Sequence, residues 1–86
     1  MTDKIYALVT TESWVMCDPL LTHHNAFWLA FPTTAEIATI FDNPDDRDRF
    51  DATAIAKIVS GGQFRYSIDE SEYTVFLTEY PIGRAL

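Results

Sequence analysis

One cysteine and two adjacent histidines are the side chains whose chemistry could support nucleophilic catalysis or metal binding. Cys17 precedes His23 and His24 along the chain. A thiol reacts as its thiolate, which forms at neutral pH when a base or a cation lies nearby. However, the spacing fits no metal-binding pattern, and no second cysteine or well-placed carboxylate completes a set of ligands. We therefore expect Cys17 to be structural and both histidines to lie on the surface.

Two other segments contain residue types found in binding loops, but their spacing favours a structural role. The acidic segment 42–48 has Pro44 and Arg47 where a calcium loop needs alternating oxygen ligands and a central glycine, so a capped helix start explains it better. Segment 60–62, Ser-Gly-Gly, lacks the lysine and the strand-to-helix context of a phosphate loop, so we interpret it as a helix end. We predict no catalytic residue, no metal and no cofactor.

The charge balance is the strongest functional signal. The 86 residues include 13 Asp and Glu against six Lys and Arg, a net charge of −7, although 48% of them are hydrophobic. Such a surface repels nucleic acid and anionic membranes, and it attracts basic surfaces before contact. We therefore predict that the partner is a basic protein surface, for example on a nucleic-acid-processing or defence enzyme, with no direct binding to nucleic acid or membrane.

The carboxylates gather in two clusters along the sequence. They could imitate the phosphates of nucleic acid or meet lysines and arginines on a target protein, which raises association rates and fixes the register of binding. The alternative is a solvated surface that only keeps a small protein soluble. The first cluster consists of Asp42, Asp45, Asp46, Asp48 and Asp51, and the second of Asp69, Glu70, Glu72 and Glu79.

Aromatic side chains could supply the anchors that such a charged surface needs for affinity. Two Trp, four Tyr and six Phe are many for a core of this size, so some apolar surface could be left for a homodimer or a partner. Trp14, Tyr73 and Tyr80 are the candidate anchors, and Trp28 is a fourth aromatic of this kind. The long final strand, if it lay at a sheet edge, would offer a further pairing surface.

The first third of the chain predicts strands. Residues 4–11 are rich in β-branched and aromatic types and predict a central or well-covered strand. Residues 26–31 are continuously apolar and also favour a strand, which stops at Pro32. Between the two, residues 13–17 predict a short strand, and residues 18–21, which begin Asp-Pro, predict a helical turn.

The middle of the chain predicts two helices and the final third a hairpin. Thr33 and Thr34 cap a helix that places Ile37, Ile40 and Phe41 on one stripe and ends near residue 42. Residues 43–60 form either one helix or a turn followed by a helix from about residue 51, closed by the glycines at 61 and 62. Residues 64–68 and 73–80 predict two strands joined by a short polar turn.

Together these elements predict one compact α+β domain over residues 1–86. It has an antiparallel or mixed sheet of about four strands, two helices on one face and a C-terminal β-hairpin. With a single cysteine and no signal-peptide pattern, we expect a cytoplasmic protein.

The predicted function is that of a small acidic inhibitor or antagonist, similar in size and charge to immunity, phage anti-defence or DNA-mimic proteins. One alternative is a structural or regulatory subunit that forms a homo- or hetero-oligomer through aromatic surface. The least favoured alternative is a small ligand-binding domain or enzyme that uses Cys17, His23 or His24.

Overall fold

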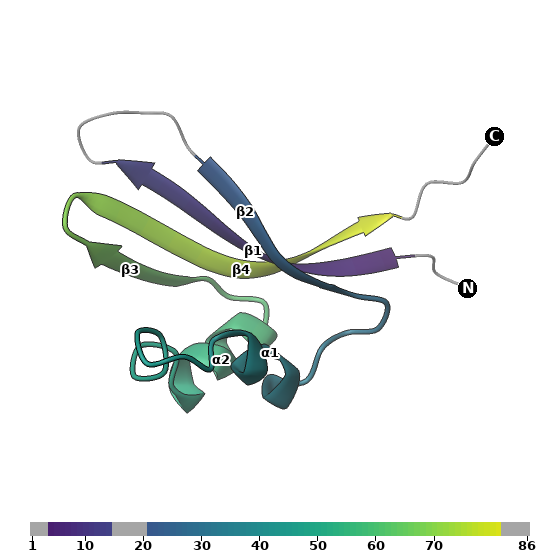
Figure 1. Ribbon diagram of the computed structural model, residues 1–86. Coiled ribbons are helices and arrows are strands. Elements are labelled where there is room, and N and C mark those ends of the chain that lie inside the picture. Colours follow the sequence, from purple (N-terminus) through teal and green to yellow (C-terminus); the bar gives the residue numbers. More distant parts are fainter. Residues whose placement is uncertain (1–3, 15–20, 82–86) are drawn as a thin grey trace.

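The computed structural model describes residues 4–14 and 21–81, which form four strands and two helices. The strands make one antiparallel sheet in the order β2-β1-β4-β3, and both helices lie on the same face of it (Figure 1). This arrangement confirms the predicted α+β class and the C-terminal hairpin. The elements are β1 (Lys4–Trp14), β2 (Leu21–Trp28), α1 (Thr34–Ile40), α2 (Ala52–Val59), β3 (Phe64–Ile68) and β4 (Ser71–Pro81).

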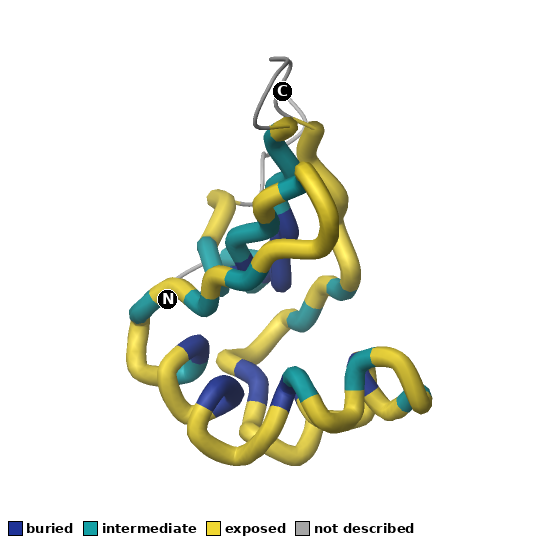
Figure 2. Tube along the Cα trace, turned by 90° about the vertical axis from the view of Figure 1, so that its left-hand side faces the viewer, coloured by how far each residue is buried: buried dark blue, intermediate teal, exposed yellow. Residues whose placement is uncertain are grey.

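The hydrophobic core lies between the helices and the sheet. Figure 2 shows buried residues in both layers, on the strands of the sheet and on the helices. Leu8 of β1 and Val75 of β4 enter the core from the sheet and are fully buried there. Ile37 of α1 and Ile58 of α2 enter it from the helices and are also fully buried. Because alternate strand residues point to opposite faces, the neighbours of Leu8 in the chain point away from this core.

The first two strands differ in extent from the predictions. β1 continues through Ser13 and Trp14, so the predicted second strand at 13–17 is wrong where it is described, and its residues 15–17 lie outside the described residues. β2 begins at Leu21 and ends at Trp28, which also overturns a helical turn that includes Leu21. The polar start of β2 is extended because it pairs with β1. This pairing joins residues that are distant in the chain, so the local hydrophobic pattern does not predict it.

The first helix begins at the predicted threonine cap. The capped helix start predicted for segment 42–48 is wrong, because residues 44–49 form a turn and the second helix begins after it. The Thr33 side chain accepts a hydrogen bond from the Glu36 backbone, and the Glu36 side chain accepts one from the Thr33 backbone, which is a complete capping box. Asp51 caps α2, so the turn-then-helix alternative for residues 43–60 is confirmed. Ile37 and Phe41 are buried as predicted, but Ile40, the last residue of α1, is 37% exposed. Gly61, with φ +94°, ends α2 in a conformation that favours glycine.

The hairpin turn and the sheet order settle where the last strand lies. Asp69 and Glu70 connect β3 to β4, and Asp69 has a positive φ of 55°. β4 pairs with β3 on one side and with β1 over eleven residue pairs on the other. The expectation that the final strand forms a sheet edge is therefore wrong, since β2 and β3 are the edges of this sheet.

In the described part of the chain, neither helix is long and apolar enough to cross a membrane.

Candidate partner-binding surface

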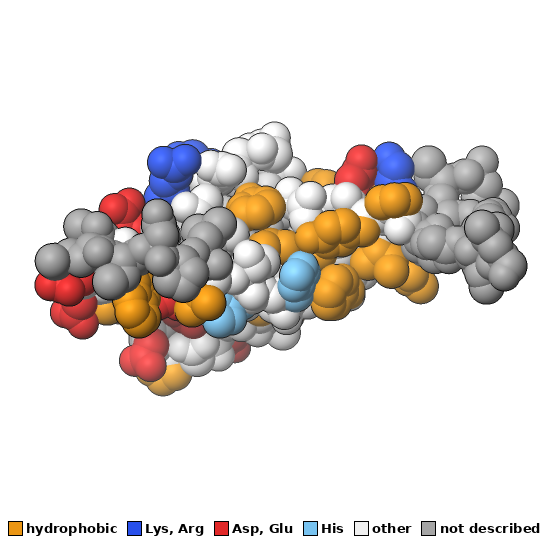
Figure 3. Space-filling view, turned by 90° about the horizontal axis from the view of Figure 1, so that it is seen from above, with side chains coloured by type: hydrophobic (Ala, Val, Ile, Leu, Met, Phe, Trp, Pro, Cys, Tyr) orange, Lys and Arg blue, Asp and Glu red, His pale blue; other side chains and the backbone are white. Residues whose placement is uncertain are grey.

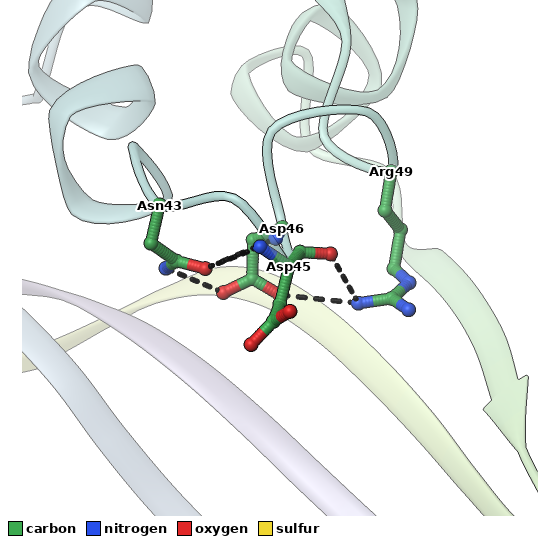
Figure 4. A network of polar contacts seen from close by, with 4 residues as sticks. All are labelled: Asn43, Asp45, Asp46 and Arg49. Atoms are coloured by element: carbon green, nitrogen blue, oxygen red, sulfur yellow. Dashed lines mark hydrogen bonds and ion pairs between the residues drawn. The ribbon is translucent and has the colours of Figure 1, made fainter.

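The first acidic cluster lies in a compact turn between α1 and α2. The Asn43 side-chain oxygen accepts hydrogen bonds from the backbone N–H groups of Asp45 and Asp46, at 3.1 and 3.0 Å (Figure 4). The Asn43 amide in turn donates to the Asp46 carboxylate at 2.9 Å. An asparagine at this position stabilises the turn because its side chain replaces missing backbone acceptors. The fold of this segment thus depends on Asn43 and Asp46.

Asp46 also fixes an arginine against the sheet. The Arg49 guanidinium donates to the Asp46 carboxylate at 3.1 Å, and it lies over the ring of Tyr66 on β3 at 4.6 Å from the ring centre. Burial raises the pKa of the Tyr66 hydroxyl above its usual value of 10.0, and the Asp46 charge acts in the same direction while Arg49 opposes it. Asp46 is therefore a structural residue that attaches the turn to β3.

Three more of the predicted partner-binding carboxylates are used within the protein. Asp42 pairs with Arg47 at 3.0 Å, and Glu79 pairs with Lys4 at 3.1 Å. Asp51 accepts the hydrogen bond that caps α2. A carboxylate that already has a partner gains less from a second positive charge than a free one does. These residues remain part of the negative surface, but they are weaker candidates for contact with a partner.

Five carboxylates have neither an ion pair nor a hydrogen bond among the described residues, and each belongs to an exposed residue. Two lie in the turn between the helices, two form the β3–β4 turn, and one is the second residue of β4. Both turns lie at the end of the molecule away from the chain termini, and a view onto the sheet shows acidic side chains gathered at that end (Figures 1 and 3). We call this group the acidic end: Asp45, Asp48, Asp69, Glu70 and Glu72.

The predicted aromatic anchors are spread over the sheet. Trp14 is 48% exposed at the end of β1, where its indole N–H donates to Glu12 at 3.1 Å. Tyr73 is half-buried and stacks on Tyr66, with ring centres 4.9 Å apart. Tyr80 is 42% exposed near the opposite end of β4 from the acidic end. The remaining aromatic of this kind, Trp28, packs against the core. Trp14 is thus the best-placed exposed aromatic for contact near the acidic end.

The structure separates the two histidines. His23 and His24 are consecutive in β2, so their side chains point to opposite sides of the strand. His23 approaches Glu12 at 3.7 Å, whereas His24 shares a hydrogen bond with the Tyr80 hydroxyl at 3.2 Å. Cys17 lies outside the described residues. Over residues 4–14 and 21–81, no three His, Asp or Glu side chains are grouped so that they could hold a metal ion.

A shallow pocket of about 410 Å³ lies between the two helices. Its lining is mostly apolar and includes Ala35, Ala38, Phe50 and Ile55, with Thr34 at its edge. None of these side chains is an acid, a base or a nucleophile of the kind that general acid–base catalysis needs. The pocket adds no chemistry to the acidic end.

Sequence reasoning missed two aromatic residues on the sheet face away from the helices. Phe27 and Phe76 lie there beside His24, whose surface position was predicted, and Phe27 is 57% exposed. The signal that could have found them is the continuous apolar run in β1, which predicts a strand covered on both faces. The helices cover only one face of the sheet.

No protein-family model, curated protein or solved structure matches this chain.

Proposed function

We propose that this protein is a small acidic antagonist that binds a basic site on another protein and blocks it. The observation that carries the proposal is the acidic end, where five exposed carboxylates with neither an ion pair nor a hydrogen bond among the described residues lie on two turns and at the start of β4. A basic surface that docks there gains new charge pairs and breaks none of those that stabilise the fold. The analogy with immunity, anti-defence and DNA-mimic proteins rests on size and charge alone.

The physical role of the acidic end would be to attract and orient the partner. Charges at the rim of an interface mainly raise the association rate, and this effect weakens as salt screens the field. Affinity then needs a buried apolar or aromatic contact. Trp14 is the candidate for this contact, because β1 ends at the same side of the molecule as the β3–β4 turn (Figure 1).

The first experiment identifies the partner by its salt sensitivity. The tagged protein is immobilised, exposed to a lysate of the cells that produce it, and eluted with stepwise increases in salt. We expect a basic protein that elutes at intermediate salt and whose own activity falls when the purified antagonist is added. Elution of no basic protein would contradict the proposal.

Variants that remove carboxylates from the acidic end then test the site, and a control variant removes an equal charge elsewhere. With the purified partner, replacing all five residues of the acidic end by Asn or Gln should weaken binding at least about tenfold at low salt, mostly through a slower association rate. A two-site variant, Asp45→Asn with Glu70→Gln, should weaken binding by a smaller factor. Its control, Glu36→Gln with Glu79→Gln, removes the same charge elsewhere and should bind normally, since glutamine also completes a capping box. Equal binding by the five-site variant and the original protein would refute the proposal.

A further inference from the structure

The face of the sheet opposite the helices is apolar around the first half of β1, where a solvated face should be polar, and it becomes polar toward the acidic end, with Thr11, Ser13 and Thr74. An antiparallel sheet with one covered face normally alternates hydrophobic residues inward with polar residues outward. Here the outward positions of the central strand β1 include Ile5, Ala7 and Val9, and the outward positions of its neighbours include Phe27 and Phe76. We call this surface the outer face. No described element lies over it (Figures 1 and 2).

Aromatic rings from two strands form a layer on the outer face. The His24 ring stacks on Phe27 with ring centres 5.5 Å apart and planes within 12°. His24 also reaches across β1 to the Tyr80 hydroxyl of β4, at 3.2 Å. Beneath this layer Ala7 and Val9 are 0% and 2% exposed, although they lie outside the core between sheet and helices. The outer face therefore carries a second hydrophobic layer, in which buried small side chains lie beneath aromatic rings that are exposed to solvent.

The charge distribution favours a second copy of this chain as the partner of the outer face. The outward positions of β1 and β2 carry no Asp, Glu, Lys or Arg among the described residues, and the only such residues on β3 and β4 are Arg65 and Glu72, near the acidic end. A basic partner would meet few carboxylates on the outer face and would therefore gain few charge pairs there. A second copy, which repels the first through a net charge of −7, can approach without facing like charges only through such a neutral surface.

The size of the outer face also fits a second copy. β1 and β4 have 11 residues each. β2 and β3 are shorter, with 8 and 5 residues. At the usual rise and strand spacing, the four strands together cover roughly 570 Å². Standard protein interfaces bury roughly 600–1,000 Å² per partner, so the outer face lies near the lower end of the size that a stable dimer uses.

We propose that two copies of this chain pack their outer faces together around a two-fold axis. The product is a sandwich of two four-stranded sheets with the helices on the outside, at the usual sheet spacing of about 10 Å. The centre of the dimer interface, from which water is excluded, is formed by Phe27, Phe76 and Tyr80. The proposal does not depend on the function of the acidic end, of which only Glu72 lies at an outward position of the sheet.

The test measures the mass of the purified protein by sedimentation velocity, with reductant present so that Cys17 cannot link two chains. We expect a dimer at micromolar concentration that persists in high salt, because apolar contact holds it. Phe27→Asp should weaken dimerisation at least about 100-fold, since it places two unpaired carboxylates in the interface. Tyr80→Glu should act in the same direction.

The control is Ile40→Asp, which adds the same charge to an exposed apolar residue on the helix layer and should remain dimeric. Circular dichroism confirms that each variant is folded. A strict monomer at high micromolar concentration would overturn the proposal. So would a dimer that tolerates both Phe27→Asp and Tyr80→Glu, because it would use another surface such as the free edge of β2.

Discussion

Tyr66 connects three parts of the molecule through a single side chain. The Arg49 guanidinium lies over the Tyr66 ring, and the Tyr73 ring stacks on it. The Phe50 ring meets the Tyr66 ring edge-on, with the two ring centres 5.7 Å apart. The sequence predicted Tyr66 as an inward residue of a strand, but it did not predict the arginine above it. Arg49 reaches Tyr66 because Asp46 and Asn43 fix the turn from which it projects.

The raised pKa of Tyr66 predicts how stability depends on alkaline pH. The folded protein favours the neutral hydroxyl, so this contribution to stability is fully present below the unfolded pKa near 10 and is lost as the pH rises through the higher folded value. In an absorbance titration of tyrosinate, Tyr66→Phe should remove the latest ionisation step. Tyr80→Phe should leave that step in place. A late step that persists in Tyr66→Phe would contradict the assignment.

At the scale of elements, helix ends were the most predictable features. Capping depends on residues within one turn of the helix end, so Thr33 and Gly61 can be recognised from their neighbours alone, whereas the cap of α2 was predicted in segment 42–48 and lies at Asp51. Strand limits were less predictable. The His-His-Asn segment of β2 has no strong preference for a strand, and it is extended because β1 supplies its hydrogen-bond partners, with a register shift between Leu8 and Val9.

Two aspartates that differ in one hydrogen bond test the cap of α2. Asp51 accepts from the Ala54 backbone N–H at 2.9 Å, whereas Asp48 is exposed and has no hydrogen bond among the described side chains. Asp51→Ala should lower the free energy of unfolding by about 1 kcal/mol. Asp48→Ala should change it by less than about 0.5 kcal/mol. Urea denaturation measures both, and equal effects would show that the cap contributes nothing specific.

At the scale of the whole molecule, one small core joins the two layers. Leu8 lies in this core together with Val75, Ile37 and Ile58, all of them fully buried. Burying these side chains is the main favourable term in folding, and domains of this kind are stable by only about 5–15 kcal/mol. Loss of one central side chain should therefore affect the sheet and both helices together.

Leu8→Ala tests this cooperativity. We expect a loss of about 2–5 kcal/mol in the free energy of unfolding, because the substitution leaves a cavity in the core. Ile40→Ala, at an exposed position on α1, should change stability by less than about 1 kcal/mol. Both are measured at one protein concentration, since dimerisation would make the apparent stability depend on concentration. A small effect of Leu8→Ala would place the core elsewhere.

The sequence by itself determined the types of most elements, the cap of the first helix, the hairpin and the α+β class with helices on one face. These depend on hydrophobic period and on residues close together in the chain. Only the tertiary structure decided that β4 lies inside the sheet, that β2 begins at Leu21, and that four of nine candidate carboxylates already have internal partners. It also left the outer face of β1 without a covering element. Strand order, ion pairs and exposure arise between residues far apart in the sequence, and no local pattern encodes them.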